Sequence, residues 1–168
     1  MRVGIGFDMH ALREGRRLVL GGVEIAFPCG LDGHSDADVL THAVIDAVLG
    51  AAGAGDIGGR FGTDAAWTRD IRSLRLLEEA VAAVAGMGYA VSNADVTVVA
   101  EAPRLQPHLP AMRGNLARAL RVGEGQVNVK GTTAKLMGLI GSGEGIAALA
   151  VVSLLPALPT VAPPSPGV

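Results

Sequence analysis

Cysteine is nearly absent from the sequence: among its 168 residues only Cys29 is present, so no disulfide can form within the chain. Aromatic residues amount to 3%, and 14 basic against 16 acidic side chains leave a net charge of −2. This balance excludes the basic surface that holds nucleic acid, so any anionic ligand must bind at a local site. The longest apolar stretch, residues 146–158, is too short to cross a bilayer. With no charged and apolar leader before the first strand, we expect a cytoplasmic protein.

Hydrophobic residues are abundant, at 49%, and 24 glycines accompany them. This composition predicts an aliphatic core with tight turns at the glycines. At about 150 residues per domain, the length predicts one domain over residues 1–156. Four of the last ten residues are proline, which predicts a disordered, proline-rich tail over residues 157–168.

Hydrophobic periodicity predicts an α+β fold. Alternation from Val3 to His10 is typical of a half-buried strand, with Val3, Ile5, Phe7 and Met9 on one face and Gly4, Gly6, Asp8 and His10 on the other. Further strands are predicted at 18–20, 23–25, 91–100, 127–130 and 146–155, helices at 39–51, 71–85 and 110–120, and loops around Pro28 and Gly30, at 53–66 and at 138–145. We expect a single mixed sheet with helices on one face, a ferredoxin-like variant, whose other face packs against copies of the same chain.

Asp8, His10 and His42 form the first cluster of candidate functional residues. Positions i and i+2 of a strand are about 6.5 to 7 Å apart on one face, close enough for a carboxylate and an imidazole to bind one ion. His42 lies on the less apolar side of the helix 39–51 and could supply a third ligand. Two histidines and a carboxylate with a vacant fourth position form a catalytic zinc arrangement. The alternative is a capping aspartate with two ordinary histidines.

The other clusters are candidate phosphate and ribose contacts. His34 and Ser35 precede the helix 39–51, where unpaired N–H groups favour an anion, although Ser35 in Ser35–Asp38 is also a plausible helix cap. Thr132 and Thr133, with the glycines at 138, 141, 143 and 145, could cradle phosphate oxygens or simply form a turn. Asp56 is a plausible acceptor for ribose hydroxyls or a turn residue.

Taken together, these segments resemble the 2-C-methyl-D-erythritol 2,4-cyclodiphosphate synthase family from Met1 to about Leu155. The resemblance is carried by GFDMH at Gly6–His10, GHSDADVLTHA at Gly33–Ala43, GDIG at Gly55–Gly58, AEAPRL at Ala100–Leu105, VNVKGTT at Val127–Thr133 and GEGIAA at Gly143–Ala148.

The resemblance implies a homotrimeric lyase with active sites between subunits. Its reaction cyclises 4-diphosphocytidyl-2-C-methyl-D-erythritol 2-phosphate with release of CMP, in the non-mevalonate isoprenoid pathway. Zn²⁺ or a similar ion would bind Asp8, His10 and His42, and Mg²⁺ or Mn²⁺ would bind the diphosphate. His34 and Thr133 match the positions that stabilise the transition state. The implied substrate contacts are Asp8, His10, His34, Ser35, Asp56, Gly58, Ala100, Pro103, Arg104, Leu105, Gly131, Thr132 and Thr133.

Two positions and one loop depart from the family pattern. Lys135 replaces a glutamate that binds the second divalent ion, and a protonated lysine cannot ligate Mg²⁺ but can offset phosphate charge. Ser142 replaces an arginine near a channel on the trimer axis. The loop 61–66 lacks the usual proline-aspartate pattern, which predicts greater mobility.

Two other functions fit the same residues. A zinc phosphohydrolase would use the same three ligands with metal-bound water as the nucleophile. A non-catalytic trimeric binding protein is the second alternative, suggested by Lys135 and Ser142.

Overall fold

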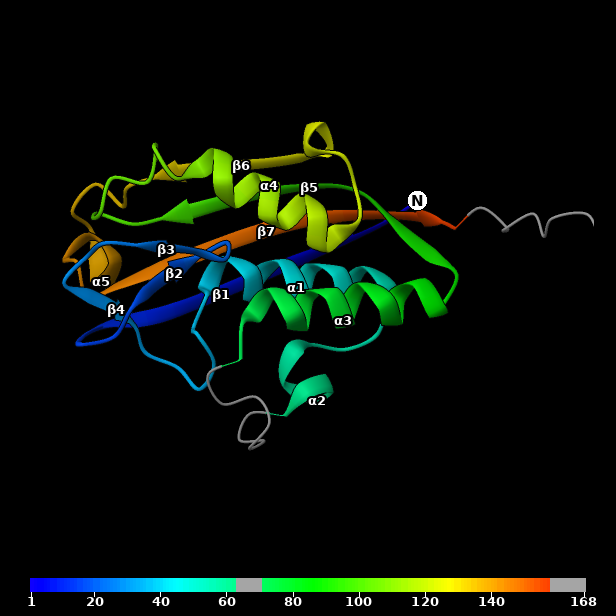
Figure 1. The fold of residues 1–168 in the computed structure, drawn as a ribbon, viewed down its shortest axis with the longest axis horizontal. Coiled ribbons are helices and arrows are strands. Elements are labelled where there is room, and N and C mark those ends of the chain that lie inside the picture. Colours follow the sequence, from blue (N-terminus) through cyan, green and yellow to red (C-terminus); the bar gives the residue numbers. More distant parts are fainter. Residues whose placement is uncertain (63–70, 158–168) are drawn as a thin grey trace, which may run out of the picture.

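A computed structural model describes residues 1–62 and 71–157 of the chain (Figure 1). The elements are β1 (Arg2–Glu14), β2 (Leu18–Leu20), β3 (Val23–Ile25), β4 (Cys29–Leu31), α1 (Val39–Ala52), α2 (Ile57–Phe61), α3 (Ser73–Gly86), β5 (Tyr89–Val99), α4 (Leu109–Leu120), the 3₁₀ helix η2 (Glu124–Gln126), β6 (Val127–Thr132), α5 (Gly138–Gly141) and β7 (Gly145–Pro156). The predicted helices and long strands are confirmed, with ends that shift by a few residues. Most of the loop 61–66 and nearly all of the predicted tail lie outside the described residues.

Five strands form one mixed sheet in the order β4–β1–β7–β5–β6. β7 pairs antiparallel with both β1 and β5, and β5 pairs parallel with β6. The predicted α+β mixed sheet is thus confirmed, but β2 and β3 form a separate hairpin instead of joining it. Gly21 and Gly22 at the hairpin turn have φ values of 55° and 69°, a left-handed conformation that glycine adopts without strain.

Helices α1, α3 and α4 cover one face of the sheet (Figure 1). The closest approach is between β1 and α1, where a Cβ atom at Gly4 would lie 2.0 Å from the Ala47 carbonyl oxygen and one at Gly6 would lie 1.9 Å from that of Ala43. Glycine is therefore required at both positions for the helix to lie this close. Asp8 and His10 lie on the same face of β1 as Gly4 and Gly6. Their side chains therefore lie on the side of the strand that faces α1.

The opposite face of the sheet is apolar and exposed. On β1, Ile5 and Phe7 are 67% and 59% exposed, and their partners on β7, Val151 and Leu149, are 37% and 42% exposed. The predicted alternation is confirmed, with the glycine side of β1 packed against α1 and the apolar side exposed within the chain. Only the glycine side admits α1, and no element in the described part of the chain covers the apolar side.

Three segments predicted to be loops contain short elements. Residues 29–31 form β4, which pairs with residues 12–14 of β1, while α2 and α5 occupy 57–61 and 138–141. These elements have three, five and four residues, too few for hydrophobic periodicity to distinguish them from loops.

The start of α1 also differs from the prediction, because Asp38 and not Ser35 is its N-cap. Asp38 Oδ1 accepts hydrogen bonds from the backbone N–H groups of Thr41 at 3.0 Å and Gly21 at 2.9 Å, and Oδ2 accepts one from Gly22 at 2.7 Å. The cap is thus fixed by the β2–β3 hairpin as well as by the helix. His34 consequently lies in the preceding loop and not at the helix N-terminus.

None of the helices in residues 1–62 and 71–157 has the length and apolar character needed to span a membrane.

Candidate active site

Asp8, His10 and His42 meet where β1 crosses α1. Asp8 Oδ2 lies 2.9 Å from His10 Nε2 and 3.0 Å from His42 Nδ1, and the two nitrogens are 3.4 Å apart. The side chains are 27%, 20% and 12% exposed in the order Asp8, His10, His42. The predicted cluster is thus assembled, with one ligand atom of each residue turned toward a common point.

The carboxylate and the imidazoles shift one another's pKa values. Burial alone would raise the pKa of Asp8, but hydrogen bonds from His10 and His42 outweigh it and hold that pKa well below its usual range. Burial likewise lowers the pKa of His10, but its bonds to Asp8 and to the Asp32 carbonyl oxygen raise the pKa above its ordinary value. The ionised carboxylate of Asp8 holds both imidazoles in place. A metal cation can bind to this group by replacing the imidazole protons that face Asp8.

The donor set fits a divalent transition metal ion. The three ligand atoms lie within 4.8 Å of one another. Two imidazole nitrogens and one carboxylate oxygen are ligands that Zn²⁺ accepts in tetrahedral catalytic sites, where substrate takes the fourth position. The three side chains could therefore hold such an ion.

His34 and Ser35 line the same cavity as the metal-ligand cluster, about 250 Å³ in volume. Ser35 Oγ lies 3.2 Å from His42 Nε2. Arg16 donates hydrogen bonds to the carbonyl oxygens of Gly33 and Ser35, at 3.0 and 3.2 Å, and so holds the loop that carries them. The loop thus adds the imidazole of His34 and the hydroxyl of Ser35 to the cavity that the metal-ligand cluster lines.

Helix α2 brings Gly58 into this cavity as well. Asp56 is the N-cap of the helix, because its Oδ1 accepts a hydrogen bond from Gly59 N–H at 2.7 Å. The helix start is also held by Asp46 on α1, whose Oδ1 accepts from Ile57 N–H at 2.8 Å. Burial raises the pKa of Asp46. Sequence reasoning missed Asp46, although its position one turn after His42 on the same helix was a usable signal.

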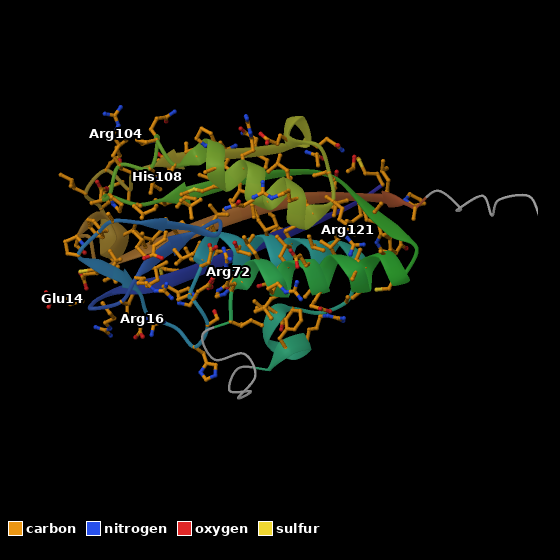
Figure 2. The ribbon with its side chains drawn as sticks, viewed as in Figure 1. Glu14, Arg16, Arg72, Arg104, His108 and Arg121 are labelled. Carbon is orange, nitrogen blue, oxygen red and sulfur yellow. The ribbon has the colours of Figure 1, made fainter. Side chains whose placement is uncertain are left out.

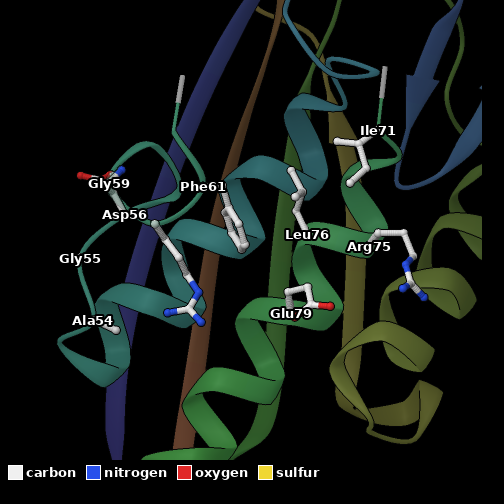
Figure 3. Close-up of a pocket in the computed structure, with 10 residues that line it drawn as sticks. Ala54, Gly55, Asp56, Gly59, Phe61, Ile71, Arg75, Leu76 and Glu79 are labelled. Atoms are coloured by element: carbon white, nitrogen blue, oxygen red, sulfur yellow. The ribbon is translucent and has the colours of Figure 1, made fainter. Parts of the chain in front are cut away.

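A larger cavity of about 790 Å³ adjoins the first one, between α2 and α3. Figure 3 shows Asp56 and Gly59 on one side of it and Arg75 and Glu79 of α3 on the other. Phe61 and Leu76 line both cavities, so the two cavities share part of their lining. Asp56 lines the larger cavity and Gly58 lines the smaller one.

The remaining predicted contacts line a different cavity of about 280 Å³, at the ends of β5 and β6. Parallel pairing sets Val99 beside Thr132, and Ala100 N–H donates to the Thr132 carbonyl oxygen at 3.0 Å. The exposed Arg104 extends from this end of the molecule (Figure 2). The predicted residues that line this cavity are Ala100, Pro103, Arg104, Leu105, Gly131, Thr132 and Thr133.

A single chain does not bring the two predicted catalytic residues together, since His34 and Thr133 line different cavities that share no residue. The suggested cradle of threonines and glycines is not formed either. Gly143 and Gly145 line a fourth cavity with residues of β1, because α5 and the turn after it fold back toward that strand. Lys135 is exposed near Thr133, whose Oγ accepts from Lys135 N–H at 3.4 Å, whereas Ser142 donates to Glu144 at 2.6 Å.

The sequence of this chain matches the model of the YgbB family over residues 1–155. It is 53% identical over 155 residues to the 2-C-methyl-D-erythritol 2,4-cyclodiphosphate synthase of Geotalea uraniireducens, covering 92% of this chain and 98% of that protein. It is 55% identical over 152 residues to the synthase of Syntrophomonas wolfei, covering 90% and 97%.

Solved structures of the same kind share the fold. The bifunctional IspDF of Campylobacter jejuni superposes with a TM-score of 0.87 at 42% identity, over 91% of this chain and 42% of that longer one. The CDP complex of Plasmodium falciparum IspF superposes with a TM-score of 0.81 at 31% identity, over 94% and 97%. The chain therefore belongs to the YgbB family, the family of the 2-C-methyl-D-erythritol 2,4-cyclodiphosphate synthases.

Proposed function

We propose that this chain is a lyase that converts 4-diphosphocytidyl-2-C-methyl-D-erythritol 2-phosphate into 2-C-methyl-D-erythritol 2,4-cyclodiphosphate and CMP. The observation that carries the proposal is the cluster of Asp8, His10 and His42 in a chain of this family, with a loop imidazole and the start of α2 lining the same cavity. The product belongs to the non-mevalonate route to isoprenoids.

The reaction is an internal phosphoryl transfer. An oxygen of the substrate's 2-phosphate attacks the β-phosphorus of the diphosphate, and the bond from that phosphorus to the bridging oxygen breaks, so CMP leaves with the electron pair. The nucleophile is already ionised at neutral pH and needs no strong general base. Catalysis then consists of positioning and of neutralising charge, and intramolecular geometry alone can contribute up to roughly 7 to 11 kcal/mol.

The chain's residues divide this work. Asp8, His10 and His42 would hold a zinc ion, which when bound polarises a phosphate oxygen. His34 and the Thr133 hydroxyl neutralise the transferring phosphoryl group, with Ser35 and Thr132 beside them. Asp56 and Gly58 contact the ribose. The cavity at the ends of β5 and β6, lined by Ala100, Pro103, Arg104, Leu105 and Gly131, receives the cytidine.

The active site is completed between copies of the chain. The metal-ligand cluster and the cytidine cavity share no residue in one chain, which supports a site that joins the two cavities from neighbouring chains. We propose a homotrimer in which the exposed apolar face of the sheet is the contact surface, as in the expected ferredoxin-like packing. A Mg²⁺ or Mn²⁺ ion at the diphosphate would lack the usual acidic ligand because Lys135 stands there.

The test is to mix purified protein with the cytidyl substrate, Zn²⁺ and Mg²⁺ and to follow the products by phosphorus NMR. We expect CMP and the cyclic diphosphate in equal amounts. Release of inorganic phosphate without a cyclic product would establish the phosphohydrolase instead, and no turnover would favour the binding protein. His10→Ala should abolish both zinc binding and turnover, whereas His108→Ala, which removes an imidazole at the start of α4, should keep the bound zinc.

A further inference from the structure

His42 has a polar partner on the side of its ring that faces away from Asp8. Its Nδ1 lies 3.0 Å from Asp8 Oδ2, and its Nε2 lies 2.9 Å from Ser73 Oγ. Ser73 is the first residue of α3 and is fully buried. A third element of the fold, remote in sequence from both β1 and α1, therefore reaches the metal-ligand cluster through a hydroxyl group.

Asp36 sets the direction of that hydroxyl group. Ser73 Oγ lies 2.5 Å from Asp36 Oδ1, and Ser73 N–H donates to Asp36 Oδ2 at 3.0 Å. A carboxylate is an acceptor only, so the Ser73 hydroxyl donates to Asp36 and presents its lone pairs to His42. The Nε2 atom of His42 must then carry a proton and donate it to Ser73. Without a metal ion the other nitrogen, Nδ1, donates to Asp8, and an ion that replaces this proton would be bound by the Nδ1 lone pair.

Ser35 offers the competing arrangement. Its Oγ lies 3.2 Å from His42 Nε2 and accepts a hydrogen bond from Ala37 N–H, also at 3.2 Å. With that bond accepted, the Ser35 proton can turn toward Nε2 and favour the opposite tautomer of His42. The contact to Ser73 is shorter, and its proton is committed to a carboxylate, so Ser73 decides the tautomer.

We propose that Ser73, held by Asp36, is a positioning residue of the metal centre that accepts the Nε2 proton of His42 and so presents Nδ1 to the ion. The proposal rests on the proposed metal site. His10 has a backbone version of the same arrangement, since its Nδ1–H donates to the Asp32 carbonyl oxygen at 2.5 Å and leaves Nε2 for the ion. Outer hydrogen bonds of this kind fix the tautomer and orientation of metal-binding histidines.

Zinc affinity tests the proposal directly, measured by competition with a chromophoric chelator on the full chain. We expect Ser73→Ala to bind zinc about tenfold to a hundredfold more weakly than the unmodified protein. The matched control is Ser35→Ala, which removes a neighbouring hydroxyl but leaves the pair of Ser73 and Asp36 in place, and it should lose less affinity. Equal losses in the two variants, or no loss in Ser73→Ala, would overturn the role of Ser73.

Nitrogen-15 NMR of the histidines supplies a readout that a merely structural role would not move. In the zinc-loaded protein, and in Ser35→Ala, Nε2 of His42 should carry a proton that exchanges slowly with water. In Ser73→Ala that proton should exchange rapidly, and an unchanged exchange rate would contradict the proposal.

A second variant covers the case in which Ser73→Ala does not fold. The amide of Asp36→Asn can accept only one of the two hydrogen bonds from Ser73, so zinc affinity should fall in the same direction, and an unchanged affinity would overturn the proposal. If the unmodified protein binds no zinc, the proposed metal site itself is wrong. That result is distinct from zinc binding that does not depend on Ser73.

Discussion

Asp8 links both histidines of the metal-ligand cluster through one carboxylate oxygen. The alternation along β1 was enough to predict that Asp8 and His10 share a face, because the period of a strand is fixed by its backbone. His42 was not predictable from spacing in the same way, since its position depends on how closely α1 approaches Gly4 and Gly6. Asp36, Asp46 and Ser73 were missed because their roles arise from contacts between elements that are distant in sequence.

The pKa shifts of Asp8 and His10 predict how pH affects the stability of the protein stripped of metal. The pKa of Asp8 is lowered on folding, so its contribution is present above the unfolded value of about 3.9 and is lost as pH falls through the folded pKa. The pKa of His10 is raised, so its contribution is present below about 6.5 and is lost as pH rises through the folded pKa.

The stabilisation should therefore be largest between about pH 4 and 6.5 and should fade as pH rises above that range. Urea unfolding in EDTA at several pH values measures it as the difference between the unmodified protein and Asp8→Asn. A difference that stays constant from pH 5 to 9 would contradict the coupling of these two groups.

Lys135 predicts an unusual response to magnesium. Its ammonium group can offset diphosphate charge where the family resemblance implies a metal-binding carboxylate, so adding Mg²⁺ to the zinc-loaded enzyme should change turnover little. Lys135→Glu should make turnover depend strongly on Mg²⁺. Lys135→Met removes the charge without adding a ligand and should gain no such dependence. An absolute Mg²⁺ requirement in the unmodified enzyme would rule out the compensation by Lys135.

Elements long enough to show a period were predictable from the sequence, and those fixed by partners elsewhere were not. Helix α1 was predicted from its apolar spacing, but its cap depends on Gly21 and Gly22 of the hairpin. Asp56 was expected either to bind ribose or to form a turn, and it caps α2, a helix of five residues that periodicity could not detect. The boundaries closest to the candidate site were therefore the least predictable.

The packing of α1 on β1 gives a prediction at the level of these two elements. A Cβ atom at Gly6 would collide with the Ala43 carbonyl oxygen, so Gly6→Ala must push the helix away from the strand. We expect a loss of about 1 to 3 kcal/mol in the free energy of unfolding, as for an overpacked core, together with weaker zinc binding because His42 moves with α1. Urea unfolding and chelator competition measure the two effects.

Gly86→Ala at the end of α3 is the matched control, because a Cβ atom there meets nothing within 4 Å. It should leave zinc affinity unchanged and stability unchanged or slightly higher. Equal behaviour of the two variants would show that the close approach of α1 does not position His42.

At the scale of the whole molecule, a net charge of −2 is compatible with a substrate rich in phosphate because the contacts are local. The site residues are divided between two cavities, and the sheet exposes an apolar face on β1 and β7. Assembly of identical chains would bury that face and complete the site in one step. A hydrophobic period alone could not reveal this, since it does not say whether a face is covered by the same chain or by another.

Mixing two inactive variants tests this division of the site. His42→Ala damages the metal-ligand cluster and Thr133→Ala damages the other cavity, so each variant alone should be inactive. In a trimer whose sites each join the two cavities from adjacent chains, every mixed trimer contains one intact site. An equal, random mixture should then recover about a quarter of the unmodified activity.

Co-refolding His42→Ala with Asp8→Asn is the control, because both changes fall in the same cavity and no site is restored. Recovery no greater than in that control would mean that both cavities serve the substrate within a single chain or that the second cavity takes no part.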